Sequence, residues 1–196
     1  MGQDSDILSG YEVLLGVTGG IACYKVAALT SRLVQAGAGV SVAMTESAQR
    51  FVAPLTFQSL SGRQVYTGMW DAVERFDPRH VSLTDRADLM IVAPATANII
   101  GKIASGIADE LVSTLAITAM ATCPILLAPA MNERMWQNPI VQANFEKLTG
   151  LGMAAVGPNE GWLACRAVGK GRMAEPEEIF DAAKAILLKK RPKAAG

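Results

Sequence analysis

Three side chains of this sequence could move a proton or hold a carboxylate: His80, Asn132 and Cys165. A lone histidine is more often structural than catalytic. We expect His80 on a polar loop, however, and there its imidazole, which changes charge near neutral pH, could act as a base. Asn132 directly follows an apolar run, where its amide could bind a carboxylate or cap the next helix. Cys165 is adjacent to Arg166, whose positive charge would lower the pKa of the thiol and favour proton transfer.

The other cysteines, Cys23 and Cys123, stand in helical or apolar surroundings, and we predict that both are small core residues. Three cysteines form an odd set without metal-ligand spacing, which predicts no metal site and indicates a reducing compartment. The first residues show no basic start followed by an apolar stretch, so no signal peptide is visible. We therefore expect a cytoplasmic protein.

A second group of residues could bind the phosphate of a cofactor. Gly19 and Gly20 follow an apolar run, and Ile21 opens the next predicted helix, so free backbone N–H groups would converge there. A plain tight turn explains the glycine pair about as well. The segment lacks the Lys-Ser/Thr of a P-loop and the Gly-x-Gly-x-x-Gly pattern of a dinucleotide site, so neither of these sites is indicated.

The residues that follow the next two predicted strands could extend this site: Thr45, Ser47, Pro94, Thr96 and Asn98. Hydroxyl groups at Thr45 and Ser47 could donate to the same phosphate. Glu46 between them could hold a ribose, so NAD is disfavoured but stays open. Thr96 and Asn98 could cap a helix, or they could bind a flavin ring and its ribityl chain. The residue types alone leave the cofactor open.

Strongly apolar segments must position these residues. Because the runs do not alternate with polar residues, they predict strands buried on both faces, hence a parallel sheet with helices on either side. Strands are expected over 13–17, 39–44, 89–93, 125–128 and 153–156, and helices over 21–34, 54–60, from about 97, from about 109, over 138–148 and over 177–188. We predict a single three-layer α/β/α domain, Rossmann-like (flavodoxin-like), with its ligand beyond the C-terminal ends of the strands.

Composition supports a folded domain. The 196 residues are 51% apolar and 18% charged with zero net charge, which is untypical of disordered or nucleic-acid-binding chains. The uncharged stretch 111–131 contains Pro124 and Pro129, so we predict a buried helix and a buried strand there, not a membrane span. We expect an N-terminal tail over 1–10, the domain over 11–188 and a solvated basic tail over 189–196.

Three motifs carry a family resemblance. Residues 129–136, Pro-Ala-Met-Asn-Glu-Arg-Met-Trp, have the form Pro-x-Met-Asn-x-x-Met-Trp. Leu-Ala-Cys at 163–165 is followed by Gly-Lys-Gly-Arg-Met at 169–173, and Pro-Ala-Thr-Ala-Asn at 94–98 is followed by Gly-Ile-Ala-Asp at 106–109. In these motifs, and over about 13–176, the chain resembles the flavin-containing cysteine decarboxylases, and among them the bacterial phosphopantothenoylcysteine decarboxylases.

The resemblance implies an FMN enzyme that decarboxylates phosphopantothenoylcysteine to phosphopantetheine in coenzyme A biosynthesis, by transient oxidation of the cysteine moiety. It implies that His80 assists deprotonation, that Asn132 grips the carboxylate and that Cys165 supplies a proton. The implied FMN ligands are Gly19, Gly20, Ile21, Thr45, Ser47, Pro94, Thr96 and Asn98. The implied substrate-binding residues are Met131, Ala164, Arg166, Lys170 and Arg172, whose three cations are candidates for the substrate phosphate.

The chain departs from the family pattern at Arg166, where the family usually has glycine; the arginine would stiffen the loop and add a charge near Cys165. The synthetase domain that is often fused to bacterial members does not follow within the 196 residues, so we expect either a stand-alone enzyme or a domain excised from such a fusion. A separate phosphopantothenate–cysteine ligase could then be a partner. Family members assemble as trimers or multiples of trimers with FMN between subunits, which implies a homotrimer or a higher multiple here.

Other interpretations stay open. One is a decarboxylase of peptides that end in cysteine, and another is a non-catalytic flavin-binding regulatory subunit. A flavin prenyltransferase of similar fold is disfavoured by His80, the Met-Asn motif and Cys165. A plain electron carrier is disfavoured because it would need no such set of proton-transfer and carboxylate-binding residues.

Overall fold

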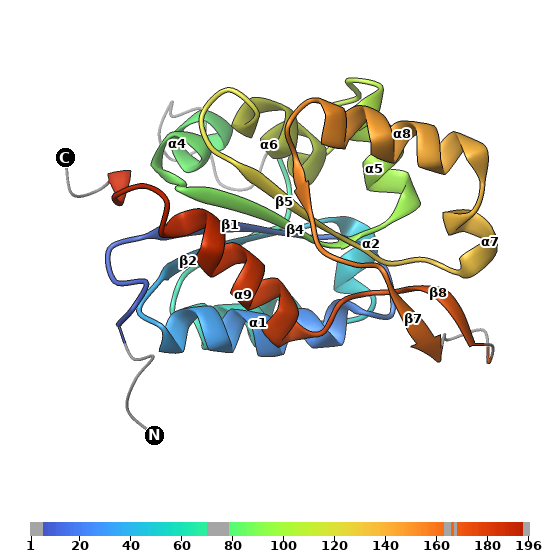
Figure 1. Cartoon of the computed structure of the whole chain (residues 1–196). Helices are drawn as coiled ribbons and strands as arrows, with labels where there is room; N and C mark the ends of the chain where they lie inside the picture. The colour runs from blue at the N-terminus through green and yellow to red at the C-terminus, as the bar shows by residue number, and fades with distance from the viewer. Residues whose placement is uncertain (1–5, 70–78, 163–165, 167, 194–196) are drawn as a thin grey trace.

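Six parallel strands form the central sheet (Figure 1). The computed structural model describes residues 6–69, 79–162, 166 and 168–193, with the backbone alone at residues 79 and 80. The strands are β1 (Glu12–Val17), β2 (Gly39–Met44), β3 (Val65–Tyr66), β4 (Leu89–Ala95), β5 (Ile125–Pro129) and β6 (Ala154–Ala155), in the order β3-β2-β1-β4-β5-β6. The chain winds outward from β1 in one direction and from β4 in the other, so a topological switch point lies between these two strands.

Helices cover both faces of the sheet (Figure 1). One layer contains α1 (Cys23–Gln35), α3 (Pro54–Ser61) and α9 (Pro176–Leu187). The other contains α4 (Arg79–Arg86), α5 (Ala97–Ala104), α6 (Leu111–Ala119) and α8 (Pro139–Gly150). Two short helices, α2 (Glu46–Gln49) and α7 (Glu133–Trp136), follow β2 and β5. The predicted three-layer α/β/α architecture is confirmed.

Each central strand contributes to two cores, because its side chains alternate between the faces of the sheet. On β1, Val13 and Leu15 belong to the core that contains Phe57 of α3, whereas Leu14 belongs to the core that contains Val112 of α6. All five side chains are at most 1% exposed. Burial on both faces is the physical reason why the strand sequences are apolar without alternation.

The structure differs from the sequence prediction before β4. His80 lies in the first turn of α4 and not on a loop. The prediction was wrong because α4 is mostly polar. Leu83 in the helix and Ala87 just after it are buried against the second core, and so few apolar residues resemble a loop in the sequence.

A second difference lies after β6. The segment expected to be a loop forms an antiparallel hairpin of β7 (Asn159–Trp162) and β8 (Val168–Arg172). Its strands are rich in glycine and polar residues, so the hydrophobic alternation that marks a half-buried strand is absent from the sequence. Backbone pairing, which the sequence pattern does not reveal, defines this element.

The C-terminal segment lies at the N-terminal ends of β1 and β4. The hydroxyl of Tyr11 donates to the carbonyl of Lys190 (2.6 Å). The Asp88 carboxylate accepts from the backbone N–H groups of Glu12 and Lys193, both at 2.8 Å. The charged side chains of residues 189–191 and 193 are exposed, as expected, while the backbone here is held against β1 and β4.

The uncharged stretch 111–131 forms α6, a turn and β5. This agrees with the prediction of a buried helix followed by a buried strand. Among the helices in the described part of the chain, none combines the length and the apolar character needed to cross a membrane.

Candidate functional site

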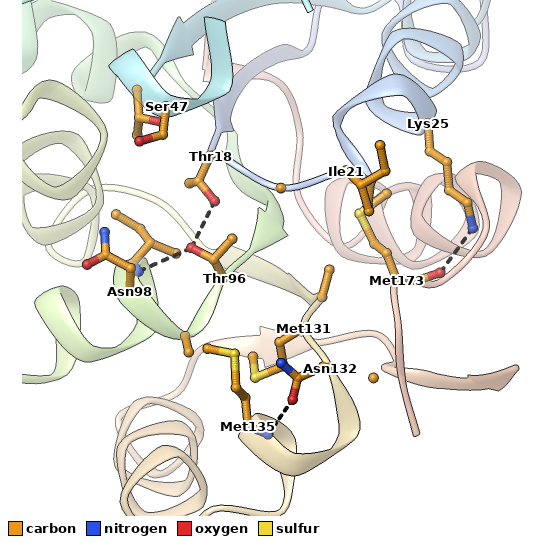
Figure 2. A pocket seen from close by; sticks show the side chains of 18 of the residues that line it. Thr18, Ile21, Lys25, Ser47, Thr96, Asn98, Met131, Asn132, Met135 and Met173 are labelled. Atoms are coloured by element: carbon orange, nitrogen blue, oxygen red, sulfur yellow. Dashed lines mark hydrogen bonds between the residues drawn. The ribbon is translucent and has the colours of Figure 1, made fainter. Parts of the chain in front are cut away.

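A cavity of about 900 Å³ opens at the C-terminal ends of β1, β2, β4 and β5 (Figure 2). It is lined by residues 18–22, 24, 25, 45–47, 96–99, 102, 110, 130–132, 135, 162 and 171–173. The cavity spans the switch point between β1 and β4, where open α/β sheets bind their ligands. Its volume lies within the range of small-molecule and cofactor sites.

The turn between β1 and α1 presents backbone donors to this cavity. α1 begins without a capping side chain. None of the described residues accepts a hydrogen bond from the N–H groups of Gly19, Gly20 or Ile21. Free N–H groups at a helix N-terminus attract anions, because they and the helix macrodipole favour negative charge. The turn is therefore suited to a phosphate group.

Close contacts fix this turn against its neighbours. The Thr18 hydroxyl donates to the Pro94 carbonyl (2.5 Å) and lies 3.2 Å from the Thr96 hydroxyl, which joins the ends of β1 and β4 (Figure 2). Gly19 approaches α2 so closely that a Cβ there would overlap the Ser47 side chain. Glycine is thus required at position 19 by packing, whether or not a ligand is bound.

Two of the predicted hydroxyl residues are helix caps. Thr45 Oγ1 accepts from the N–H of Ala48 in α2 (3.2 Å), and Thr96 Oγ1 accepts from the N–H of Ile99 in α5 (3.4 Å). Capping gives both threonines a structural function. Ser47 and Asn98 also line the cavity, but neither side chain caps a helix.

Asn132 is the N-cap of α7 and lies at the cavity (Figure 2). Its Oδ1 accepts from the N–H of Met135 at 2.9 Å. In the described part of the chain no acceptor lies within hydrogen-bond distance of its side-chain N–H groups. Capping therefore occupies the oxygen and leaves two donors for an oxygen of a ligand.

Sequence reasoning missed a polar group on α5 and α6. Lys102 lies one turn after Asn98 and pairs with Asp109 (2.7 Å); this hydrogen bond lowers the pKa of the Asp109 carboxyl. The Glu110 carboxylate accepts from the first N–H groups of α6 at 2.9 and 3.0 Å. The i, i+4 spacing of Asn98 and Lys102, and an acidic residue before an apolar helical run, were signals that could have found both residues.

Lys25 was missed as well. Its side chain is 8% exposed, and Nζ donates to the Glu175 carboxylate (2.9 Å) and to the Met173 carbonyl (3.3 Å; Figure 2). The hydrogen bond from Lys25 is the main reason why the pKa of Glu175 is lowered, and Arg172 pairs with the same carboxylate. The i, i+4 spacing from Ile21 places Lys25 on the cavity side of α1.

The hairpin forms one wall of the cavity. Trp162 of β7 and Arg172 of β8 line it. The carbonyl of Gly171 accepts from the N–H of Met131 (2.9 Å), which ties β8 to the segment after β5. Arg166, between the two strands, has φ 62°, the left-handed conformation that favours glycine. This backbone geometry explains why glycine suits the position better than arginine.

The cavity brings together many of the residues named from the sequence: Gly19, Gly20, Ile21, Thr45, Ser47, Thr96, Asn98, Met131, Asn132 and Arg172. Pro94, Arg166 and Lys170 do not line it. The side chain of His80 and the residues Ala164 and Cys165 lie outside the described residues.

The two remaining cysteines lie away from the cavity lining. Cys23 is fully buried, as predicted for a core residue, and its thiol donates to the Thr18 carbonyl. Cys123 is half-buried. Burial raises the pKa of both thiols, so both are poor nucleophiles.

Comparisons with known proteins relate this geometry to a family. The family model described as Flavoprotein matches residues 1–188. The coenzyme A biosynthesis bifunctional protein CoaBC of Bacillus subtilis is 53% identical over 173 residues, which are 88% of this chain and 42% of that protein. CoaBC of Escherichia coli K12 is 43% identical over 176 residues, which are 90% of this chain and 43% of that protein. The chain thus spans less than half the length of these curated relatives.

Solved structures share the fold. A PPC decarboxylase mutant complexed with pantothenoylaminoethenethiol is 30% identical with a TM-score of 0.79, over 89% of this chain and 97% of that one. The FMN-dependent cysteine decarboxylase SpaF is 28% identical with a TM-score of 0.81, over 96% of this chain and 99% of that one.

Proposed function

Because the chain belongs to the Flavoprotein family, we propose that it binds FMN and decarboxylates phosphopantothenoylcysteine to phosphopantetheine in coenzyme A biosynthesis. The observation that carries the proposal is the cavity, which joins a phosphate-binding turn after β1 to the free amide donors of Asn132 after β5. The relatives support it, since two are coenzyme A biosynthesis proteins and one neighbour is a PPC decarboxylase.

The donor set of the cavity fits FMN. The N–H groups of Gly19, Gly20 and Ile21 suit its phosphate, and the Ser47 hydroxyl can donate to the same group. Thr45, Thr96 and Asn98 can bind the ribityl chain and ring, and Pro94 supports the turn through its carbonyl. When bound, FMN supplies a reversible two-electron oxidation of the cysteine moiety, which makes loss of carbon dioxide favourable.

The protein orients the substrate and moves protons. Asn132 donates both side-chain N–H groups to the substrate carboxylate while its oxygen stays fixed by the α7 cap. His80 takes a proton from the substrate, and Cys165 returns one to the product; both follow from the family resemblance. No net oxidation results, because phosphopantothenoylcysteine loses carbon dioxide and gains one proton.

The substrate lies between Asn132 and the hairpin. Met131 supplies an apolar contact, and Arg172 is the hairpin cation that lines the cavity and could bind the substrate phosphate, although it shares Glu175 with Lys25. Arg166, Lys170 and Ala164 complete the proposed substrate-binding set from the family motif. Arg166 and Lys170 do not line the cavity, so they would act at its margin.

The proposal includes assembly and cellular setting. Ile21, Tyr24 and Trp162 line the cavity and are 59%, 63% and 65% exposed, which is consistent with a neighbouring subunit that covers them in a homotrimer or a higher multiple. A cytoplasmic location follows from the same family resemblance, and a phosphopantothenate–cysteine ligase, either separate or fused as in many bacterial members, would act with this domain. The neighbour SpaF keeps a second candidate open, decarboxylation of a peptide that ends in cysteine.

Mass spectrometry tests the function directly. Purified protein loaded with FMN is incubated with phosphopantothenoylcysteine, and we expect loss of carbon dioxide to give phosphopantetheine. Cys165→Ser should stall at an oxidised decarboxylated product, whereas Cys123→Ser, a cysteine away from the cavity, should behave as wild type. Turnover of a peptide ending in cysteine, with none of phosphopantothenoylcysteine, would overturn the substrate assignment in favour of the second candidate.

A further inference from the structure

β8 packs closely against the segment that carries Asn132 and Glu133. Gly169 and Gly171 are both buried. A Cβ at Gly171 would overlap the carbonyl oxygen of Met131, and a Cβ at Gly169 would overlap the carboxylate of Glu133. Gly171 therefore permits close approach of the two backbones, and Gly169 leaves room for the Glu133 side chain.

Two hydrogen bonds join the segments at this contact. The Met131 N–H donates to the Gly171 carbonyl (2.9 Å), and the Lys170 N–H donates to Glu133 Oε1 (3.2 Å). The β7–β8 register shifts so that Gly171 has no partner on β7. This bulge turns part of β8 away from its partner strand and toward the turn after β5.

The hydrogen bond from Lys170 gives Glu133 a function that the sequence did not reveal. We propose that Glu133 is a positioning residue: its carboxylate holds β8 beside Asn132 and so sets where the hairpin wall stands relative to the amide donors of Asn132. This role rests on the proposed decarboxylase function. It assigns Glu133 no contact with the substrate, since Glu133 does not line the cavity.

The geometry favours an acceptor, and above all a charged one, at the end of this side chain. Glu133 is half-buried, and a backbone N–H bound to a charged acceptor forms a stronger hydrogen bond than one bound to a neutral acceptor. Removing the side chain leaves the Lys170 N–H without this acceptor and a gap against Gly169, where the glycine has no side chain to fill it. The wall residues Trp162 and Arg172 are carried by the same hairpin.

Variants of Glu133 in the FMN-loaded full chain test the proposal. Glu133→Ala should speed hydrogen exchange of the Lys170 amide and lower kcat/KM about tenfold, since a hydrogen bond to a charged group is lost. Glu133→Gln keeps a neutral acceptor and should restore kcat/KM to within about threefold of wild type. Glu160→Ala is the matched control, because Glu160 lies opposite Lys170 on β7 and is exposed; it should change neither measurement.

Each outcome decides one question. Unchanged Lys170 exchange in Glu133→Ala would show that the contact is not held in solution and would overturn the proposal. Faster exchange with unchanged kcat/KM would limit Glu133 to a structural contact, which also overturns a positioning role. If wild type fails to turn over phosphopantothenoylcysteine, the proposed function fails, and Lys170 exchange together with turnover of a peptide ending in cysteine then tests the role of Glu133.

Discussion

The side chain of Asn132 divides its hydrogen-bonding groups between the fold and the cavity. Its oxygen caps α7, and its N–H groups remain for a ligand. Asn138 offers a natural comparison, since its oxygen caps α8 by accepting from Ile140 (2.9 Å) and it does not line the cavity. Comparing the two residues separates capping from ligand binding, because Asn138 caps a helix but does not line the cavity.

Replacing Asn132 with aspartate should separate these two functions. Asn132→Asp keeps a capping oxygen, so the free energy of unfolding should stay within about 1 kcal/mol of wild type. It loses the amide donors and places a negative charge beside the substrate carboxylate, so kcat/KM should fall by about 100-fold or more. Steady-state kinetics and urea unfolding measure the two effects.

Asn138→Asp is the control for this prediction, and it should match wild type in both measurements. Decarboxylation by Asn132→Asp at the wild-type rate would contradict the assignment of Asn132 to the carboxylate. A large loss of stability in Asn132→Asp would instead show that the cap needs the amide itself.

At the scale of elements, one ion pair links α1 to the N-terminus of α9. Lys25 is buried in α1, and Glu175 precedes α9, 150 residues later in the sequence. Glu175 also forms a capping box with Glu178 at the start of α9. The pair therefore fixes the exit of the chain from the hairpin as well as the packing of two helices.

The lowered pKa of Glu175 predicts a dependence of stability on pH. A carboxyl whose folded-state pKa is lowered stabilises the protein above its unfolded-state pKa, about 4.3 for glutamate, and this contribution is lost as pH falls through the folded-state pKa. Glu175→Gln should thus cost about 1 kcal/mol at pH 7, a small value because the Glu175 side chain is 45% exposed. The deficit should shrink between pH 7 and pH ~3, because the wild-type carboxyl gains a proton as pH falls through its lowered folded-state pKa.

Urea unfolding at the two pH values checks this prediction. Asp181→Asn serves as control, since Asp181 pairs with Lys184 on the exposed side of α9 and is 68% exposed. It should alter the free energy of unfolding by less than about 0.5 kcal/mol at either pH. A deficit of Glu175→Gln that persists unchanged at the lower pH would refute the charge-based explanation.

At the scale of the whole molecule, a ligand bound in the cavity should raise the free energy of unfolding of the protein. A ligand that binds only the folded state stabilises it by mass action, about 2.7 kcal/mol at 100 times its Kd. Because the turn after β1 offers free N–H groups for a phosphate, FMN should raise the Tm of flavin-free protein more than riboflavin does at equal concentration. Differential scanning calorimetry measures both shifts.

A serine pair provides the matched variants. Ser47→Ala should reduce the shift with FMN and leave the shift with riboflavin unchanged, since only FMN carries the phosphate. Ser59→Ala, on the exposed side of α3 away from the cavity, should leave both shifts as in wild type. Equal shifts for FMN and riboflavin in the wild type would argue against a phosphate at this turn.

The sequence by itself determined the sheet and its ligand edge. Residues 13–17, 89–93 and 125–128 are apolar on both faces, and such runs are stable only as strands covered by helices on either side. The motif around Asn132 was also sufficient to indicate the family. The strands and the motif can be identified from the sequence because each is encoded by residues that are neighbours in the chain.

Only the tertiary structure decided which distant groups meet. The pair of Lys25 with Glu175 and the contact of Glu133 with Lys170 each join segments separated by other elements. The hairpin wall joins two consecutive strands, but backbone pairing and not an apolar pattern defines it. Glycine-rich strands such as β8 carry no periodic apolar signal, and α4 is so polar that few apolar residues mark it as a core helix. The positions of such elements depend on the elements that they contact. A contact with a distant part of the chain does not produce a pattern in the spacing of apolar residues nearby.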